Sequence, residues 1–213
     1  MWTALFNAFT KITAWPLQWL CFRTRIIYED PSVQRRHIRG SAIIVSNHTS
    51  VFDYAVFLFV FFTRTLRYQM AELLFEKKGL GPLLCMLGGI RVDRNSHDFS
   101  FLSKSEEILR RGGVVGVFPE SRLPREGEER PLPFKPSAAY LALCSGAQVV
   151  PVYTNGSYFT RRRACVVIGR PLYAADLTRE GLSDRENIAA VSEELRRRVV
   201  ELEGVYRERC GEK

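Results

Sequence analysis

Short runs of β-branched residues alternate with stretches of helical periodicity along most of this chain, and this alternation constrains the fold more than any other feature. Short apolar runs between polar turns are typical of buried strands, whereas longer amphipathic segments are typical of helices. The alternation predicts a single layered α/β domain with a mixed central sheet flanked by helices. The predicted strands are 42–46, 90–92, 114–118, 149–153 and 165–168, and the predicted helices lie near 51–62, 99–111 and 136–145.

The clearest helical pattern lies near the C-terminus, behind a Ser183-x-x-Glu186 capping box. Apolar residues recur there at three- and four-residue steps, which gives the predicted helix one buried face. We expect the run Arg196–Arg198 to lie on its solvated face. The apolar positions are Ile188, Val191, Leu195, Val199 and Leu202.

The first 22 residues are strongly apolar and contain all three tryptophans of the chain. Lys11 and Pro16 divide them into pieces shorter than the roughly 20 apolar residues that a membrane-spanning helix needs. The segment also lacks the leading basic region and the cleavage site of a secretory signal. Because tryptophan rings prefer the boundary between headgroups and acyl chains, we predict a membrane-interfacial helical anchor. The tryptophans are Trp2, Trp15 and Trp19.

A basic loop follows the predicted anchor. We place the boundary at residue 39, with an N-terminal anchor and basic loop over 1–39 and the main domain over 40–213. Arginines close to anionic lipid contribute on the order of 1 kcal/mol each. The alternative is a first helix packed into the soluble core, followed by a solvated basic loop. The arginines of this loop are Arg23, Arg25, Arg35, Arg36 and Arg39.

The formal net charge of +8 favours anionic partners such as phosphates or acidic lipid. Nucleic acid is not expected, since the basic residues are spread over several segments and no nucleic-acid-binding motif is legible. The five cysteines are scattered and form no Cys-x-x-Cys pair, so we expect neither a disulfide framework nor a zinc ribbon. With the predicted anchor, this favours a peripheral or monotopic protein on the cytoplasmic face of a membrane.

A polar turn, Asn47–Asp53, lies between the predicted strand 42–46 and the helix that follows. Loops after the strands of an α/β sheet often carry reactive groups. If His48 lies on the loop and Asp53 in the first helical turn, the carboxylate can accept a hydrogen bond from one imidazole nitrogen and leave the other as a general base. Alternatively, Ser50-x-x-Asp53 is only an acidic capping box and His48 an ordinary turn residue.

Two further loops place cations at the same predicted sheet edge. The first loop contains the run Phe118–Arg122, in which the guanidinium of Arg122 can form two hydrogen bonds to a phosphate, and Lys135 adds a point charge further along the same loop. In the run Gly88–Arg94, the glycines allow close backbone approach and Arg94 presents a cation. The alternatives are a plain β-turn and surface ion pairs, each worth roughly 0–1 kcal/mol.

Together these loops resemble the motifs of the glycerolipid acyltransferase (PlsC-like) family, which includes 1-acylglycerol-3-phosphate acyltransferase. The resemblance runs from about residue 40 to 170, and four ordered motifs are more specific than any one of them. One departure is that Ser121 stands alone where the family has Gly-Thr between Glu and Arg. The matching runs are Asn47–Asp53, Gly89–Arg94, Phe118–Arg122 and Val150–Val152, supported by 71–73 and Pro133–Lys135.

The resemblance implies that an acyl group passes from acyl-CoA or acyl carrier protein to the free hydroxyl of a lysolipid, with lysophosphatidic acid as the expected acceptor. It implies a His48–Asp53 dyad as the catalytic pair and no cofactor beyond the acyl donor. We expect no metal, because His37 and His97 have no ligand-like spacing. The alternatives are another lysolipid acceptor, such as a lyso-ornithine lipid, or a catalytically silent lipid-binding protein. The expected acceptor-binding residues are Asn47, Arg94, Glu120, Arg122 and Lys135.

Overall fold

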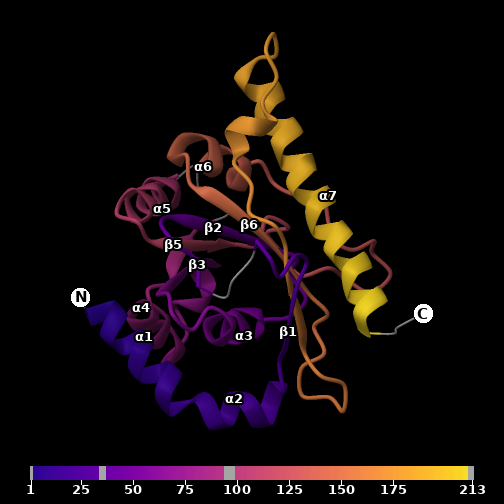
Figure 1. The fold of residues 1–213 in the computed structure, drawn as a ribbon. Helices are drawn as coiled ribbons and strands as arrows, with labels where there is room; N and C mark the ends of the chain where they lie inside the picture. The colour runs from indigo at the N-terminus through magenta and orange to yellow at the C-terminus, as the bar shows by residue number, and fades with distance from the viewer. Residues whose placement is uncertain (1, 34–36, 94–98, 211–213) are drawn as a thin grey trace.

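A seven-stranded mixed sheet forms the centre of the molecule in a computed structural model that describes residues 2–33, 37–93 and 99–210 (Figure 1). The strand order is β1-β7-β6-β2-β5-β3-β4, and every neighbouring pair is parallel except β6 and β7. The predicted α/β architecture with a mixed sheet is therefore confirmed. The strands are β1 Arg25–Tyr28, β2 Ala42–Ser46, β3 Leu66–Ala71, β4 Ile90–Val92, β5 Val114–Val117, β6 Gln148–Thr154 and β7 Cys165–Ile168.

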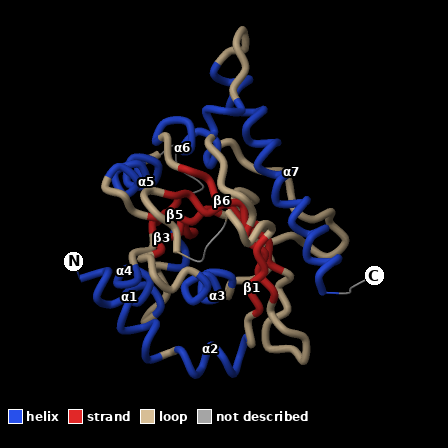
Figure 2. Tube along the Cα trace, in the orientation of Figure 1, coloured by secondary structure: helices blue, strands red, loops and turns tan. Residues whose placement is uncertain are grey.

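Helices cover both faces of this sheet, as the tube in Figure 2 shows. On one face, α3 packs Val56 and Phe57 against the sheet. On the other face, α5, α6 and α7 share a second core with Ile43 and Val45 of β2. The helices are α1 Trp2–Thr13, α2 Trp15–Phe22, α3 Asp53–Val60, α4 Leu80–Leu87, α5 Ser100–Arg110, α6 Ser137–Ser145 and α7 Asp184–Cys210, with short 3₁₀ turns at Glu72–Leu74 and Ala174–Leu177.

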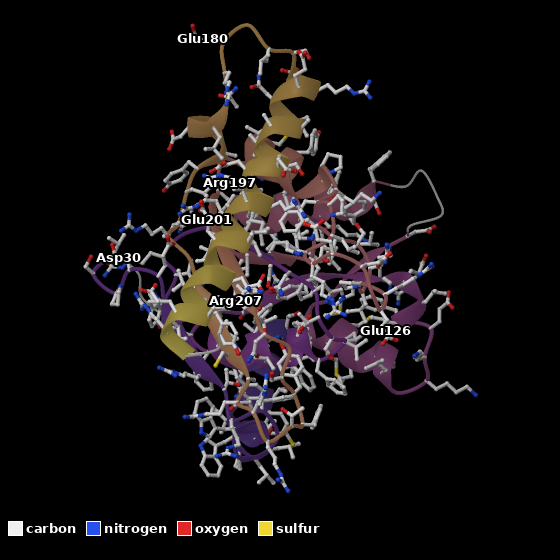
Figure 3. All side chains as sticks on the ribbon, turned by 90° about the vertical axis from the view of Figure 1, so that its right-hand side faces the viewer. Asp30, Glu126, Glu180, Arg197, Glu201 and Arg207 are labelled. Carbon is white, nitrogen blue, oxygen red and sulfur yellow. The ribbon has the colours of Figure 1, made fainter. Side chains whose placement is uncertain are left out.

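The C-terminal helix α7 follows its predicted apolar pattern, but of the run Arg196–Arg198 only Arg197 is exposed, and the partly buried Arg196 donates to the carbonyl of Pro131 at 3.0 Å. Ser183 and Glu186 exchange hydrogen bonds as a capping box at its start. Its apolar stripe, which includes Val191, Leu195 and Val199, is buried against the sheet. Charged side chains line the outer face of the same helix (Figure 3), among them Arg197, Glu201 and Arg207.

Strand β2 lies in the middle of the sheet and all five of its residues are buried. Its last residue, Ser46, is in register with Val152 of β6, and Val45 is in register with Val117 of β5. Because these three strands are parallel, the loops that follow them leave the sheet at the same edge. This register brings the loops after β2, β5 and β6 together.

The N-terminal segment forms two helices that break at Ala14, close to the predicted division at Pro16. Lys11 does not end a helix. Its buried ammonium donates to the carbonyls of Phe62 at 3.0 Å and Arg64 at 2.6 Å, just beyond the C-terminus of α3, where a cation is favoured. Asn7 donates to the last carbonyl of α4, Leu87, at 2.8 Å. The N-terminal helix is thus fixed to the domain through polar side chains.

Three elements were not predicted: β1, β3 and α4. Strand β1 lies inside the predicted N-terminal region 1–39 but pairs in parallel with β7, so the sheet extends across the predicted boundary at residue 39. Strand β1 has only four residues and opens on an exposed arginine, which gives a weak pattern. Strand β3, LRYQMA, alternates apolar and polar residues as a half-buried strand does, so the sequence carries a signal for it that the predicted strands did not include. Across the described residues, no helix has both the length and the apolar character needed to cross a bilayer.

Candidate active site

The turn between β2 and α3 is organised around the Asp53 carboxylate. Asp53 is the first residue of α3 and is fully buried. Its Oδ2 accepts hydrogen bonds from the backbone N–H groups of Thr49 at 2.7 Å and Ser50 at 3.0 Å. These N–H groups precede the helix, where a carboxylate also suits the positive end of the helix dipole. The predicted Ser50-x-x-Asp53 capping box is not formed, because Phe52 is the N-cap residue and the Ser50 hydroxyl accepts from the N–H of Phe52.

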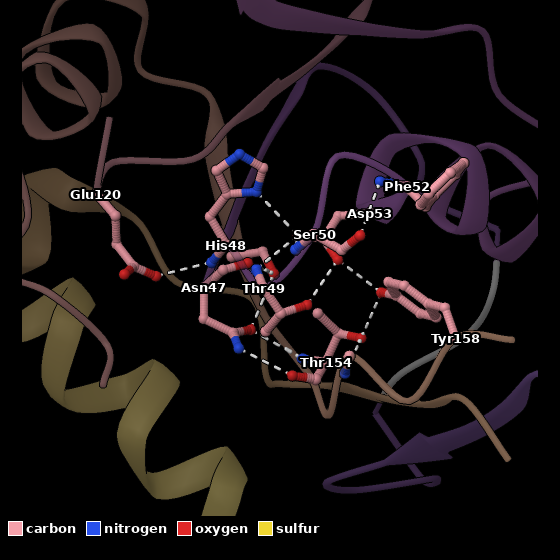
Figure 4. Close-up of polar contacts among 11 residues, drawn as sticks. Asn47, His48, Thr49, Ser50, Phe52, Asp53, Glu120, Thr154 and Tyr158 are labelled. Carbon is pink, nitrogen blue, oxygen red and sulfur yellow. Dashed lines mark hydrogen bonds and ion pairs between the residues drawn. The ribbon is translucent and has the colours of Figure 1, made fainter. Parts of the chain in front are cut away.

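The same oxygen also holds the imidazole of His48. The distance from His48 Nδ1 to Asp53 Oδ2 is 2.8 Å, and the other ring nitrogen, Nε2, points away from the carboxylate (Figure 4). The His48 ring stacks on Phe118 with centroids 4.3 Å apart, and its side chain is 18% exposed. One carboxylate oxygen therefore orders the backbone of the turn before α3 and orients the imidazole.

The second carboxylate oxygen, Oδ1, accepts two hydroxyl donors. Thr49 Oγ1 lies at 2.8 Å and the phenol oxygen of Tyr158 at 2.7 Å, and Tyr158 also shares a 2.8 Å hydrogen bond with Thr154 Oγ1. Burial and the nearby Asp53 carboxylate raise the pKa of Tyr158, which keeps the phenol protonated as a donor. Tyr158 lies 105 residues after Asp53, and no local pattern in the sequence marks it as part of the site.

Asn47 joins the carboxyl ends of β2 and β6. Its amide nitrogen donates to the carbonyl of Thr154 at 2.8 Å, and its amide oxygen accepts from the N–H of Thr154 at 2.8 Å. Asn47 was predicted to bind the acceptor. Both ends of its amide are instead used to fix the protein backbone beside His48, because the pairing of β2 with β6 continues beyond Ser46 and Val152 to bring the Thr154 backbone within reach.

Glu120 joins the loop after β5 to the same turn. One of its oxygens accepts from the backbone N–H of His48 at 2.7 Å, and the other accepts from the N–H of Leu132 at 2.8 Å. Burial raises the pKa of this carboxyl, although the two hydrogen bonds act in the opposite direction. Glu120 was predicted to contact the acceptor. In the structure its carboxylate holds two backbone segments in place, one of them at His48.

Two of the three cations predicted to bind the acceptor, Arg122 and Lys135, lie among the described residues. Arg122 forms two hydrogen bonds with Glu128, at 2.6 Å and 2.8 Å, and this pairing lowers the pKa of Glu128 to about 2. The side chain of Arg122 is 45% exposed. Lys135 is exposed and its backbone N–H donates to Pro119 at 2.9 Å. Arg94, like Arg35, Arg36 and His97, lies outside the described residues.

Ser121 occupies the position at which the resembling motif has Gly-Thr. Its φ angle of +62° lies in the left-handed region, which glycine adopts easily and other residues rarely adopt. Its N–H donates to the carbonyl of Phe118 at 3.0 Å, which closes a tight turn. The loop therefore keeps a glycine-like backbone conformation with one residue fewer.

Potential metal ligands do not gather at this turn. Within residues 2–33, 37–93 and 99–210, no group of three or more His, Cys, Asp or Glu side chains could hold a metal ion. His37 instead lies 3.0 Å from Thr63 Oγ1.

These observations define an α/β protein with a carboxylate-oriented imidazole at the carboxyl ends of its central strands, where open α/β sheets carry their reactive groups. The Acyltransferase family matches residues 24–155 of this chain, which is more than half of its length. The chain belongs to this acyltransferase family.

Individual relatives agree with this family assignment. The chain is 31% identical over 143 residues to the 1-acyl-sn-glycerol-3-phosphate acyltransferase of Bacillus subtilis, covering 65% of this chain and 69% of that enzyme. It is 35% identical over 124 residues to the human 1-acyl-sn-glycerol-3-phosphate acyltransferase beta, covering 55% of this chain but only 42% of the human enzyme. The matched stretch thus spans less than half of the human relative and half of the one from Borreliella burgdorferi.

The fold has a counterpart among solved structures. The crystal structure of the 1-acyl-sn-glycerophosphate (LPA) acyltransferase from Thermotoga maritima superposes with a TM-score of 0.63. The match covers 92% of this chain and 78% of that chain at 23% sequence identity. This similarity supports the fold.

Proposed function

We propose that this protein transfers a fatty acyl group from an acyl thioester to the free hydroxyl of lysophosphatidic acid, which yields phosphatidic acid. The observation that carries the proposal is the 2.8 Å hydrogen bond from His48 Nδ1 to the buried Asp53, with Nε2 turned away from that carboxylate. An imidazole held in this way presents a basic lone pair at a fixed position. The named relatives supply the expected acceptor.

The reaction needs one proton transfer and one substitution. His48 Nε2 takes the proton from the acceptor hydroxyl while that oxygen forms a bond to the thioester carbonyl carbon. The carbon–sulfur bond then breaks, and the imidazolium returns the proton to the departing thiolate of coenzyme A or of the carrier's pantetheine. Asp53 fixes the ring tautomer and stabilises the imidazolium. Because the thioester already carries a good leaving group, no covalent enzyme intermediate is required.

The acceptor phosphate is assigned to cations of the loops after β4 and β5. Arg122 suits this role because a guanidinium can form two hydrogen bonds to one phosphate. Binding a phosphate requires Arg122 to exchange Glu128 for the new anion, and exposed ion pairs are readily exchanged. Lys135 and Arg94 are proposed to add charge. Asn47 and Glu120 are proposed to act through the backbone that carries His48.

The N-terminal helices are proposed to lie in the membrane interface, on the cytoplasmic face. Helix α1 buries the polar residues Asn7 and Lys11 and exposes a stripe of apolar ones, the reverse of the pattern in α7. A water-exposed stripe of this kind is typical of a helix that lies in a lipid interface. Its apolar residues Trp2, Leu5, Phe9 and Ile12 are all more than half exposed.

The activity is tested by incubating the purified protein with lysophosphatidic acid and either acyl-CoA or acyl carrier protein, followed by mass spectrometry of the lipids. We expect phosphatidic acid with at least one donor, and none from a His48→Ala variant. His37→Ala is the matched control. His37 precedes β2, whereas the turn follows β2, and the His37 ring contacts Thr63, so turnover should stay intact. Equal product from His48→Ala and wild type would overturn the proposed mechanism.

A different lysolipid acceptor is the second candidate, and the Arg122–Glu128 pair is the observation that favours it. A loop whose arginine is already neutralised, and which is one residue shorter than the family motif, fits a zwitterionic headgroup such as that of a lyso-ornithine lipid. A panel of lysolipids under the same conditions distinguishes the two. Preference for a zwitterionic acceptor over lysophosphatidic acid would replace the first candidate.

A further inference from the structure

The loop between β6 and β7, residues 155–164, carries an exposed phenylalanine in an unusual conformation. Phe159 is 57% exposed and its φ angle is +56°, in the left-handed region that bulky residues rarely adopt. Such outliers persist where the surroundings or a function require them. Here the backbone presents a large apolar ring to the outside of the molecule.

Phe159 completes an aromatic cluster that joins three parts of the chain. Its ring centroid lies 5.1 Å from that of Phe22, the last residue of α2, and 4.8 Å from that of Phe52, which directly precedes Asp53. Phe22 also contacts Tyr158, the residue that donates to Asp53, at 5.5 Å. The cluster therefore connects the anchor helices, the β6–β7 loop and the catalytic turn.

The apolar surface continues from this cluster along α2. The loop and α2 reach the same lower end of the molecule in Figure 1, where the loop is drawn in orange. Trp19 is 66% exposed there and Leu20 69% exposed. Val51 and Phe52 extend the exposed apolar surface to the catalytic turn itself. Several exposed apolar side chains beside a site proposed to take a lipid acceptor fit a bilayer.

Exposed arginines border this surface. The loop continues past Phe159 and Thr160 with Arg161, Arg162 and Arg163. Arg163 Nε donates to the carbonyl of Arg23 at 3.1 Å, which ties the loop to the end of α2. A cationic rim around an apolar tip suits an anionic lipid surface. Two copies of this chain would bring like charges together if they met here, which disfavours self-association through this surface.

We propose that the β6–β7 loop is a second membrane contact, in which Phe159 enters the interface of an anionic bilayer and Arg161–Arg163 face its headgroups. Together with α2 it places the bilayer surface at the mouth of the site, so that an acceptor in the membrane reaches His48 without leaving the lipid. This inference rests on the proposed acyl transfer to a lysolipid, and it adds a specific lipid-contacting surface outside the N-terminal helices.

The test measures binding of the 213-residue protein to vesicles of phosphatidylcholine alone and of phosphatidylcholine with about 30 mol% phosphatidylglycerol, which adds a negative surface charge. Phe159→Ser is expected to weaken partitioning into both kinds of vesicle about five- to tenfold, because a large apolar side chain leaves the interface. Arg161→Glu is expected to weaken partitioning about tenfold, and only into the anionic vesicles.

Arg185→Glu is the matched control for the charge reversal. Arg185 is exposed in the first turn of α7, about 30 Å along the helix axis from Tyr206, which contacts the β6–β7 loop through Asn155. This variant should bind vesicles within twofold of wild type. Thermal midpoints check that each variant is folded.

Unchanged vesicle binding by folded Phe159→Ser and Arg161→Glu overturns the proposal. The proposal is also overturned if these variants bind vesicles as wild type does but bind an acidic acyl carrier protein more weakly. The loop would then be a docking surface for the acyl donor. Vesicle binding needs no catalysis, so its outcome is separate from the acyl transfer assay. Wild-type protein that transfers no acyl group but shows the predicted partitioning would refute the proposed function and leave the membrane contact standing.

Discussion

The turn after β2 and the loop after β5 meet at the Glu120 carboxylate, yet they are built in opposite ways. In the turn, the buried Asp53 carboxylate accepts five hydrogen bonds. In the loop, Arg122 is exposed and pairs with a surface carboxylate of its own segment, Glu128. The difference suits the two tasks proposed for these segments. A general base has to keep one orientation, whereas a phosphate-binding cation has to exchange its partner when substrate arrives.

The largest expected effect follows from removing the base. His48→Ala should lower turnover by about 10²–10⁴-fold, the range that general bases contribute. The folded state should lose only about 1 kcal/mol, because the ring stacks on Phe118 and is partly exposed. Steady-state kinetics and thermal unfolding check both values. A large fall in the thermal midpoint with residual activity would show that the rigid turn needs His48 for its structure.

Asp53→Asn should damage catalysis and stability together. The amide keeps one acceptor oxygen but turns an NH₂ group toward donors that now lack a partner, at a cost of about 3 kcal/mol. That corresponds to a fall of roughly 6–12 °C in the thermal midpoint for a chain of this size. We expect turnover to fall about 10²-fold or more. In a His48→Ala background the stability loss should remain while no further activity is lost; additive activity losses would contradict the dyad.

Glu120→Gln tests the contact between the two segments. Its amide would leave the N–H of His48 or of Leu132 without an acceptor, so we expect about 1–3 kcal/mol of destabilisation and about tenfold lower turnover. Burial raises the pKa of Glu120 above its ordinary value, so ionisation costs the folded state more than the unfolded state. Wild-type stability relative to Glu120→Gln should therefore decline as the pH rises above about 4.5. A constant difference would contradict the raised pKa.

Tyr158→Phe removes one of the two hydroxyl donors from Asp53 Oδ1. The carboxylate then interacts more strongly with the imidazolium, so the acid limb of the pH–rate profile should move to higher pH. Turnover at neutral pH should fall several-fold with little change in KM. A variant that loses stability but keeps the wild-type pH profile would show that the phenol only fills space.

Glu128→Gln is expected to give the smallest effect, and it should improve the kinetics where the other variants impair them. Without its carboxylate partner, Arg122 is available to the acceptor phosphate, and KM for lysophosphatidic acid should fall about two- to fivefold at low salt. Glu126→Gln is the matched control, since Glu126 lies exposed on the same loop (Figure 3). An increase in KM would indicate that Arg122 positions the loop and does not bind the acceptor.

Local sequence patterns predict much of the fold. The strands 90–92 and 165–168 were predicted with the bounds that the structure shows, and helix α7 with its capping box, because each has strong local periodicity. Strand β1 was missed because four residues carry little pattern, whereas β3 was missed although its apolar and polar residues alternate as in a half-buried strand. The chain breaks between α1 and α2 two residues before Pro16, at Ala14, because proline fits the first turn of the following helix.

For the site, the sequence alone determined the chemistry available: a histidine and an aspartate five positions apart after a buried strand, and cations in two later loops. The tertiary structure decided how those groups are used. Parallel register brings Thr154 to Asn47 across 107 residues and the Glu120 loop to His48 across 72, while the return of the chain after β6 brings Tyr158 to Asp53 across 105. Hydrogen bonds between distant segments depend on strand order and register, which no local pattern encodes.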